Sequence, residues 1–95
     1  MEKDRAQSAG RRKKRLRFRS WHRGTKEMDL LLGRFADAHL AAFGDAQLDD
    51  YEALLSESDP DLYNWISGLE PVSDDRTSSV LKLIIEFHNT PQDAD

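Results

Sequence analysis

The segment Arg23-Gly24-Thr25-Lys26-Glu27 combines the residue types with the clearest chemical capacity in this chain. A permanently charged arginine precedes a glycine, and a carboxylate follows about one helical turn later. Gly24 can cap a helix that starts here, with Glu27 at the third helical position reaching back to its amide. Capping accounts for Gly24 and Glu27 but not for Arg23. From the residues alone, a helix cap and a contact surface for a partner both remain open.

The other titratable residues do not form a pattern that predicts catalysis or metal binding. The three histidines, His22, His39 and His88, have no second histidine or carboxylate at metal-ligand spacing. The acidic pairs Asp49-Asp50 and Asp74-Asp75 lie near expected helix starts, where the helix dipole accounts for them. The sequence has no cysteine, no Ser/His/Asp order and no glycine-rich phosphate loop. We therefore expect a protein that is not an enzyme and holds neither a metal nor a cofactor.

Length and hydropathy indicate one small domain outside the membrane. The 95 residues leave no room for a second core. No apolar run approaches the roughly 18–20 residues of a membrane span, and the first residues resemble neither a signal peptide nor a transit peptide. The expectation is a soluble cytoplasmic protein without membrane insertion.

The net charge of −4 conceals a strong asymmetry along the chain. Residues 1–27 carry eleven Lys/Arg against three Asp/Glu, a balance of +8, whereas residues 28–95 carry three against fifteen, a balance of −12. The positive half contains the run Arg11-Arg12-Lys13-Lys14-Arg15. Within residues 11–19, this run and Phe18 suit a nucleic-acid-binding module. The alternative, a solvated or partner-facing helix edge, is preferred because Leu16, Phe18 and Trp21 are expected in the core, so no nucleic acid is expected.

Apolar spacing predicts an all-α protein, a compact bundle of about five helices. Residues 1–10 are expected to be a disordered tail, residues 11–89 a single helical-bundle domain, and residues 90–95 a second tail. The five helices are expected over residues 11–22, over residues 25–42, from Gly44 onward, over residues 60–67, and from Ser73 to Thr90-Pro91.

Three of these helices have predicted capping residues. Gly44 is expected to be an N-cap with Gln47 at the third helical position. Asp59 is expected to be an N-cap followed by Pro60, and Ser73 is expected to cap the last helix. The apolar faces of the later helices are expected to supply Met28, Leu31, Leu32, Phe35, Leu48, Tyr51, Leu54, Leu55, Leu62, Trp65, Ile66, Val80, Leu81, Ile84, Ile85 and Phe87 to the core.

Two separated motifs together resemble one protein family. Arg23-Gly24-x-x-Glu27 runs into Met28-Asp29-Leu30-Leu31-Leu32, and Asp59-Pro60-Asp61-Leu62-Tyr63-Asn64-Trp65 follows Leu54-Leu55. This combination resembles the SdhE-type succinate dehydrogenase assembly (flavinylation) factors, over residues 15–87. The resemblance implies a five-helix bundle that is not itself an enzyme. We expect a monomer located in the bacterial cytoplasm.

The resemblance also implies a partner and a contact surface. Members of this family bind the flavoprotein subunit of succinate dehydrogenase, and in some bacteria that of fumarate reductase, and promote covalent attachment of FAD to it. Carried over to this chain, Arg23, Gly24 and Glu27 form the partner-binding surface, to which Thr25, His22 and Arg19 are added. Arg23 would face a client carboxylate or main chain. An antitoxin-like interaction module is the alternative function, followed by nucleic-acid binding through residues 11–19.

Overall fold

The computed structural model describes the backbone of residues 2–72 and 78–90, and the side chains of residues 10–72 and 78–90. These residues form five α-helices and one short 3₁₀ helix, which confirms the predicted all-α bundle. In chain order the elements are α1 (Glu2–Trp21), α2 (Lys26–His39), η1 (Leu40–Ala42), α3 (Asp45–Leu55), α4 (Asp59–Ser67) and α5 (Ser79–Asn89).

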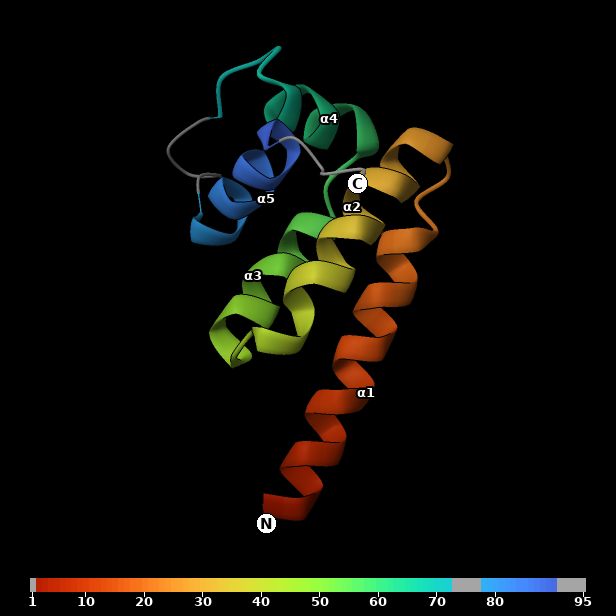
Figure 1. Cartoon of the computed structure of the whole chain (residues 1–95), viewed down its shortest axis with the longest axis vertical. Coiled ribbons are helices and arrows are strands. Elements are labelled where there is room, and N and C mark those ends of the chain that lie inside the picture. The colour runs from red at the N-terminus through yellow and green to blue at the C-terminus, as the bar shows by residue number, and fades with distance from the viewer. Residues whose placement is uncertain (1, 73–77, 91–95) are drawn as a thin grey trace.

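Helix α1 lies along one edge of the bundle, and its N-terminal half projects beyond the other helices (Figure 1). Its C-terminal half packs against α2 and α3, while α5 packs against α2, α3 and α4. The α1–α2 junction and the α3–α4 junction both lie toward the end of the molecule opposite the N-terminus (Figure 1). These two junctions carry the two sequence motifs.

The core is built from apolar side chains of every helix. Phe35 of α2 is fully buried and its ring contacts the rings of Tyr51 and Phe43 at centroid distances of 5.7 and 6.1 Å. The remaining buried apolar residues are Leu16, Met28, Leu32, Ala36, Leu40, Leu48, Leu54, Leu55, Leu62, Ile66, Val80, Leu81 and Ile84. Most of the predicted core is therefore confirmed, because the 3.6-residue period identifies the inward face of each helix.

Phe18 is an exception, since 63% of the residue is exposed. The expectation that it joins the core was wrong for a geometric reason. Leu16 and Ser20 are buried and set the inward face of α1. Phe18, two residues from each, is turned about 200° away from both at 100° per residue. Trp21 is half-buried and occupies the side of α1 that meets α2.

The indole of Trp21 lies directly over Gly33 of α2, where the two helices approach closely. A Cβ atom at residue 33 would lie 2.2 Å from Cδ2 of Trp21, well inside van der Waals contact. The indole Nε1 donates to Oδ1 of Asp37 one turn further along α2, at 3.3 Å. Gly33 therefore permits the packing of α1 on α2, despite the helix propensity that a glycine costs.

Several helix ends differ from the predicted ones. Helix α1 begins at Glu2 instead of near Arg11, because residues 2–9 contain good helix formers and no proline. The last helix begins at Ser79, with Ser78 and not Ser73 as its N-cap; the Ser78 hydroxyl accepts from the Leu81 amide at 3.0 Å. Ser73 with Asp74-Asp75, and residues 91–95 of the predicted tail, lie outside the described residues.

Two other ends agree with the predictions. Gly44 is the N-cap of α3, and its amide donates to Oε1 of Gln47 at 3.1 Å. The fourth helix ends at Ser67 with Gly68 after it.

The predicted second helix, residues 25–42, is divided into α2 and the 3₁₀ helix η1. The tighter last turn brings Leu40 and Phe43 into the core, where both are buried.

A buried hydroxyl pair joins α1 to α3. The Ser20 hydroxyl donates to the Leu16 carbonyl at 2.8 Å, and the Tyr51 hydroxyl donates to Oγ of Ser20. Burial raises the pKa of Tyr51 to about 12, although the charges of Arg23 and Arg19 act in the opposite direction. The folded protein therefore holds the phenol proton more tightly than the unfolded chain does.

This raised pKa predicts a loss of stability at alkaline pH. Above the unfolded pKa of about 10, the unfolded chain releases the Tyr51 proton while the folded protein retains it, so stability falls as pH rises. We expect a decrease of about 1.4 kcal/mol per pH unit between roughly pH 10 and pH 12. Urea unfolding across this range measures it. In Tyr51→Phe most of this slope should be absent, and an unchanged slope in that variant would contradict the assignment.

Candidate functional site

The corner between α1 and α2 is closed by a carboxylate and a glycine. Oδ1 of Asp29 accepts from the backbone amide of Arg23, and from that of Gly24 at 3.3 Å. Gly24 has φ of +130°, a conformation that side chains with a Cβ rarely adopt. A Cβ there would lie 3.9 Å from Oδ2 of Asp59, so the backbone angle and not space requires the glycine. Gly24 is exposed, which leaves its backbone accessible.

Thr25, and not Gly24, is the N-cap of α2. The Thr25 backbone is extended, as an N-cap requires, and its hydroxyl accepts from the Met28 amide at 3.3 Å. Glu27 is therefore the second helical residue, one position short of the reach back to the cap that the sequence suggested. The capping interpretation of Gly24 and Glu27 was wrong, because Gly24 has a positive φ and the extended N-cap backbone belongs to Thr25.

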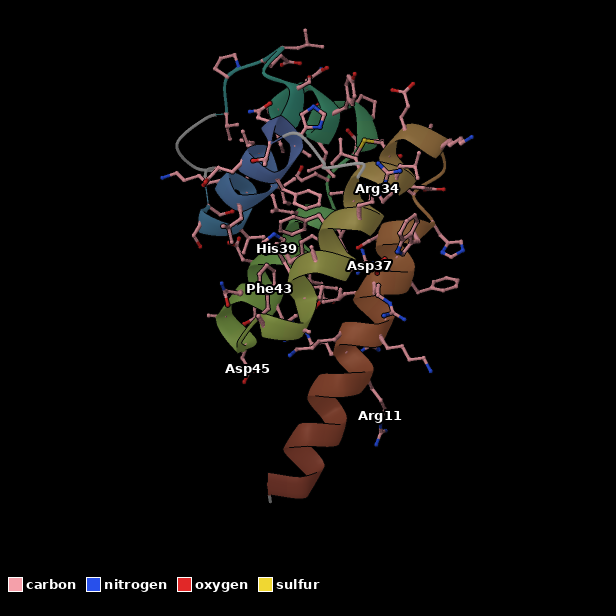
Figure 2. The ribbon with its side chains drawn as sticks, in the orientation of Figure 1. Arg11, Arg34, Asp37, His39, Phe43 and Asp45 are labelled. Atoms are coloured by element: carbon pink, nitrogen blue, oxygen red, sulfur yellow. The ribbon has the colours of Figure 1, made fainter. Side chains whose placement is uncertain are left out.

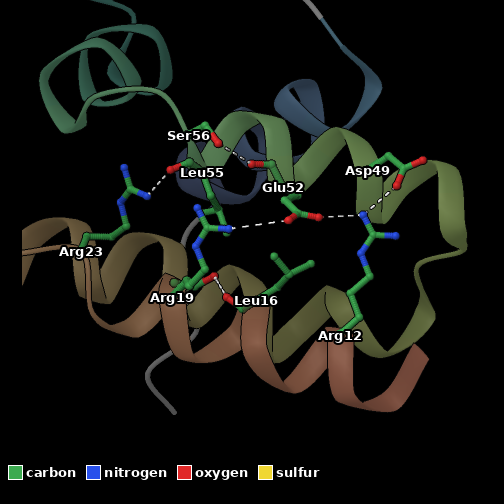
Figure 3. A network of polar contacts seen from close by, with 9 residues as sticks. Arg12, Leu16, Arg19, Arg23, Asp49, Glu52, Leu55 and Ser56 are labelled. Carbon is green, nitrogen blue, oxygen red and sulfur yellow. Dashed lines mark hydrogen bonds and ion pairs between the residues drawn. The ribbon is translucent and has the colours of Figure 1, made fainter. Parts of the chain in front are cut away.

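Arg23 faces into the protein. Its side chain is only 11% exposed, and its guanidinium uses all three nitrogens within the molecule. Nε donates to Oδ1 of Asp59 at 2.8 Å, Nη1 to the Leu55 carbonyl at 2.6 Å, and Nη2 to the Glu57 carbonyl at 2.9 Å. Figure 3 shows Arg23 reaching Leu55 at the end of α3. We expected Arg23 to face outward and contact a client. In this structure its side chain faces inward and binds residues of the same chain.

Asp59 completes an ion pair between the two sequence motifs. Oδ1 lies 2.8 Å from Nη2 of Arg23, and the Asp59 side chain is 23% exposed. Asp59 was expected to be the N-cap of α4, but Ser58 has this role, since its hydroxyl accepts from the Asp61 amide. With the cap supplied by Ser58, the Asp59 carboxylate is available to Arg23. The Arg23–Asp59 pair fixes the α1–α2 corner against the α3–α4 corner.

Two other expected site residues lie away from Glu27. Nη1 of Arg19 is 3.9 Å from Oε2 of Glu52 on α3. Figure 3 shows the Arg19 side chain directed toward Glu52. His22 is exposed; its ring stacks on Phe18 at a centroid distance of 4.0 Å, and its Nδ1 donates to the Phe18 carbonyl at 2.7 Å. The structure therefore gathers Arg23, Gly24, Thr25 and Glu27 at one corner and places Arg19 on another face.

Glu27 is exposed at the start of α2, between two hollows in the surface. No hydrogen bond or ion pair joins its carboxylate to another described side chain. The first hollow, about 320 Å³, is lined by Glu27, Leu30, Leu31, Arg34, Tyr63, Phe87 and His88. The second, about 390 Å³, is lined by Thr25, Glu27, Met28, Asp59, Pro60, Tyr63 and Asn64. We call the combined area the Glu27 surface.

The Glu27 surface joins residues that sequence reasoning did not place together. Tyr63 of α4 and Glu27 of α2 border both hollows, and Phe87 of α5 contributes to the first. The motif that begins at Asp59 contains Tyr63, so the sequence indicated that this part of α4 could be functional. No spacing rule in the sequence links Tyr63 to Phe87 of α5. A free carboxylate beside apolar hollows can bind a partner through hydrogen bonds surrounded by apolar contacts.

The described residues contain no group of three or more His, Asp or Glu side chains arranged to hold a metal ion. Within the same part of the chain, no helix is long and apolar enough to cross a lipid bilayer.

Comparison with known proteins places this chain in a family. Residues 14–88 match the model of a family described as flavinator of succinate dehydrogenase. The chain belongs to this family. The match includes both corners, the Arg23–Asp59 pair and the whole Glu27 surface, whereas residues 1–13 lie outside it. The prediction made from the two motifs is thereby confirmed.

Individual relatives of the flavinator family agree. The chain is 36% identical to the FAD assembly factor SdhE of Acetobacter pasteurianus, over 79% of this chain and 69% of that protein. It is 42% identical to the mitochondrial succinate dehydrogenase assembly factor 2 of Dictyostelium discoideum, over 76% of this chain and 51% of the relative. The corresponding protein of Meyerozyma guilliermondii is 43% identical over 77% and 57%. The chain thus spans little more than half the length of these two mitochondrial relatives.

Proposed function

We propose that this protein is an assembly factor that binds the flavoprotein subunit of succinate dehydrogenase and promotes covalent attachment of FAD to it. The proposal rests on membership of the flavinator family and on the names of relatives from bacteria and eukaryotes. It includes fumarate reductase as a second client and a monomer as the active form. The protein has no cofactor of its own in this proposal and acts on the FAD of its client.

The observation that carries the site assignment is the Glu27 carboxylate, which lies between two hollows and forms no hydrogen bond or ion pair with the side chains that the structure describes. Glu27 accepts hydrogen bonds from client donors, while the apolar lining around Tyr63 receives client side chains. The exposed Gly24 backbone allows the client main chain to approach without a Cβ in between. Arg23 is the positioning residue, because its buried pair with Asp59 holds the corner that presents Gly24, Thr25 and Glu27.

The proposed mechanism is positional. The Glu27 surface provides a hydrogen-bond acceptor and apolar contacts, and no step of the proposal requires it to act as a nucleophile or a base. Binding holds the client in an arrangement where its own histidine and the flavin meet, so the client performs the chemistry. Holding two reacting groups in the correct geometry replaces an unfavourable search by an intramolecular step, and this supplies a large rate gain without a new catalytic group.

Reconstitution tests this function directly. Apo-flavoprotein is incubated with FAD, with and without the full chain, and covalent flavin is followed by in-gel fluorescence after denaturation. We expect the chain to increase the rate of covalent attachment by about tenfold or more, the scale of a modest orientation effect. An equal yield and rate in both reactions, under conditions where attachment is incomplete, would rule the proposal out.

A further inference from the structure

The outward face of α1 carries a row of cations around an exposed aromatic ring. Arg11, Lys14, Arg15 and Phe18 follow the i, i+3, i+4, i+7 spacing and share one face of the helix. All four are exposed, and Figure 2 shows Arg11 pointing away from the bundle. We call these four residues the α1 stripe. His22 continues the same face through its stack on Phe18.

The other cations of this segment are engaged within the protein. Arg12 binds Asp49 at 2.6 Å and Glu52 at 2.8 Å, and Nζ of Lys13 donates to the Ala41 carbonyl at 2.8 Å. In contrast, the three cations of the α1 stripe form no ion pair with any other side chain that the structure describes. Arg12 and Lys13 are therefore bound within the bundle, whereas the cations of the α1 stripe remain available for a partner.

The acids that flank α1 restrict the shape of that partner. Asp37 lies 3.8 Å from Arg17 on one flank of the helix, while Asp49 and Glu52 border the other flank through Arg12. Phosphates that wrap around α1, as nucleic-acid strands do around an inserted helix, would meet these carboxylates on both sides. A flat anionic surface meets only the α1 stripe. The acidic residues of the other helices lie behind the α1 stripe. Salt screening, with a Debye length of about 8 Å, weakens their repulsion from the anionic surface.

We propose that the α1 stripe docks on the anionic headgroups of a lipid bilayer. An exposed phenylalanine among lysines and arginines, on the face opposite the packed one, suits the boundary between headgroups and acyl chains. Arg11, Lys14 and Arg15 contact lipid phosphates, and the Phe18 ring enters the interface beside them. Because no residue of the α1 stripe lines either hollow of the Glu27 surface, this inference is independent of the proposed function.

Vesicle flotation with the full chain tests the proposal. The chain should float with vesicles of phosphatidylcholine and phosphatidylglycerol at low salt, and should remain at the bottom with phosphatidylcholine alone. Lys14→Gln/Arg15→Gln should reduce the partition coefficient by about 30-fold, since each cation near an anionic surface contributes about fivefold. Phe18→Ser should reduce it by about tenfold through lost apolar burial. Melting curves should match the parent chain, because all three side chains are exposed.

A matched control removes the same charge elsewhere. Lys26→Gln/Lys82→Gln, on the exposed surfaces of α2 and α5, should float like the parent chain. Equal losses in the two double variants would overturn the proposal, because binding would then follow net charge alone. Equal flotation with neutral vesicles would also overturn it. So would stripe-dependent binding of an oligonucleotide without any vesicle binding, which would assign the α1 stripe to nucleic acid.

Discussion

Replacing Arg23 by alanine should lower the free energy of unfolding by about 2–4 kcal/mol, the scale for breaking a largely buried and hydrogen-bonded ion pair. The substitution removes every guanidinium contact to Asp59, Leu55 and Glu57. It leaves the Asp59 carboxylate without its cation, and the end of α3 without two donors. Urea denaturation followed by circular dichroism at neutral pH measures this loss, which is large for a domain of this size.

Conservative variants separate the charge from the geometry of the Arg23 contacts. Arg23→Lys keeps the cation but lacks the planar fork, so it should recover only part of the lost stability. Asp59→Asn keeps an acceptor for Nε and should cost less than Arg23→Ala. Arg34→Ala on the exposed surface of α2 is the matched control and should change stability by no more than about 0.5 kcal/mol. If Arg23→Ala were as stable as this control, the two corners would not depend on the pair.

Local patterns were sufficient to predict the helices and most of the core. The burial of Leu32, Phe35, Leu48, Tyr51 and Ile84 follows from the helical period, because an amphipathic helix has only one face to bury. The helix boundaries are less certain from sequence, because several residues near one end can each supply a cap. Ser58 and Asp59 are both favourable N-cap residues. In the structure Ser58 is the N-cap, because the Asp59 carboxylate forms an ion pair with Arg23.

The direction of Arg23 could not be read from its neighbours. An arginine beside a glycine at a helix junction is ordinarily exposed, and its partners here are 32 to 36 residues away in the sequence. The joint occurrence of the two motifs was the available signal, since Arg23 belongs to the first and Asp59 to the second. The close contact of Trp21 with Gly33 could not be predicted from the sequence either, because it depends on how α1 and α2 approach each other.

Glu27→Gln should leave the fold intact and remove much of the function. Glu27 is exposed and forms no hydrogen bond or ion pair with another described side chain. The substitution therefore removes only the favourable interaction of its charge with the helix N-terminus, about 0.3–1 kcal/mol. In the proposed function its carboxylate accepts hydrogen bonds from the client. Loss of that charge at a desolvated interface should slow covalent flavin attachment by about tenfold or more. In-gel flavin fluorescence over time gives this rate, and thermal melting gives the stability.

Asp61→Asn is the matched control for Glu27→Gln. Asp61 is also an exposed acid in the first turn of a helix, and it does not line either hollow of the Glu27 surface. It should support flavin attachment at the parent rate. If the two variants were equally impaired, the general negative charge of this end would matter and not Glu27 itself.

Arg23 and Glu27 should then fail in opposite ways, although both belong to one motif. An Arg23→Ala protein held well below its melting temperature keeps the Glu27 surface in most molecules, so cooling should restore flavin attachment. Cooling should not rescue Glu27→Gln at the same limiting concentration, because the folded population of that variant is already complete. If folded Arg23→Ala were as inactive as Glu27→Gln, the guanidinium would have to leave Asp59 and contact the client, and its role as a positioning residue would be wrong.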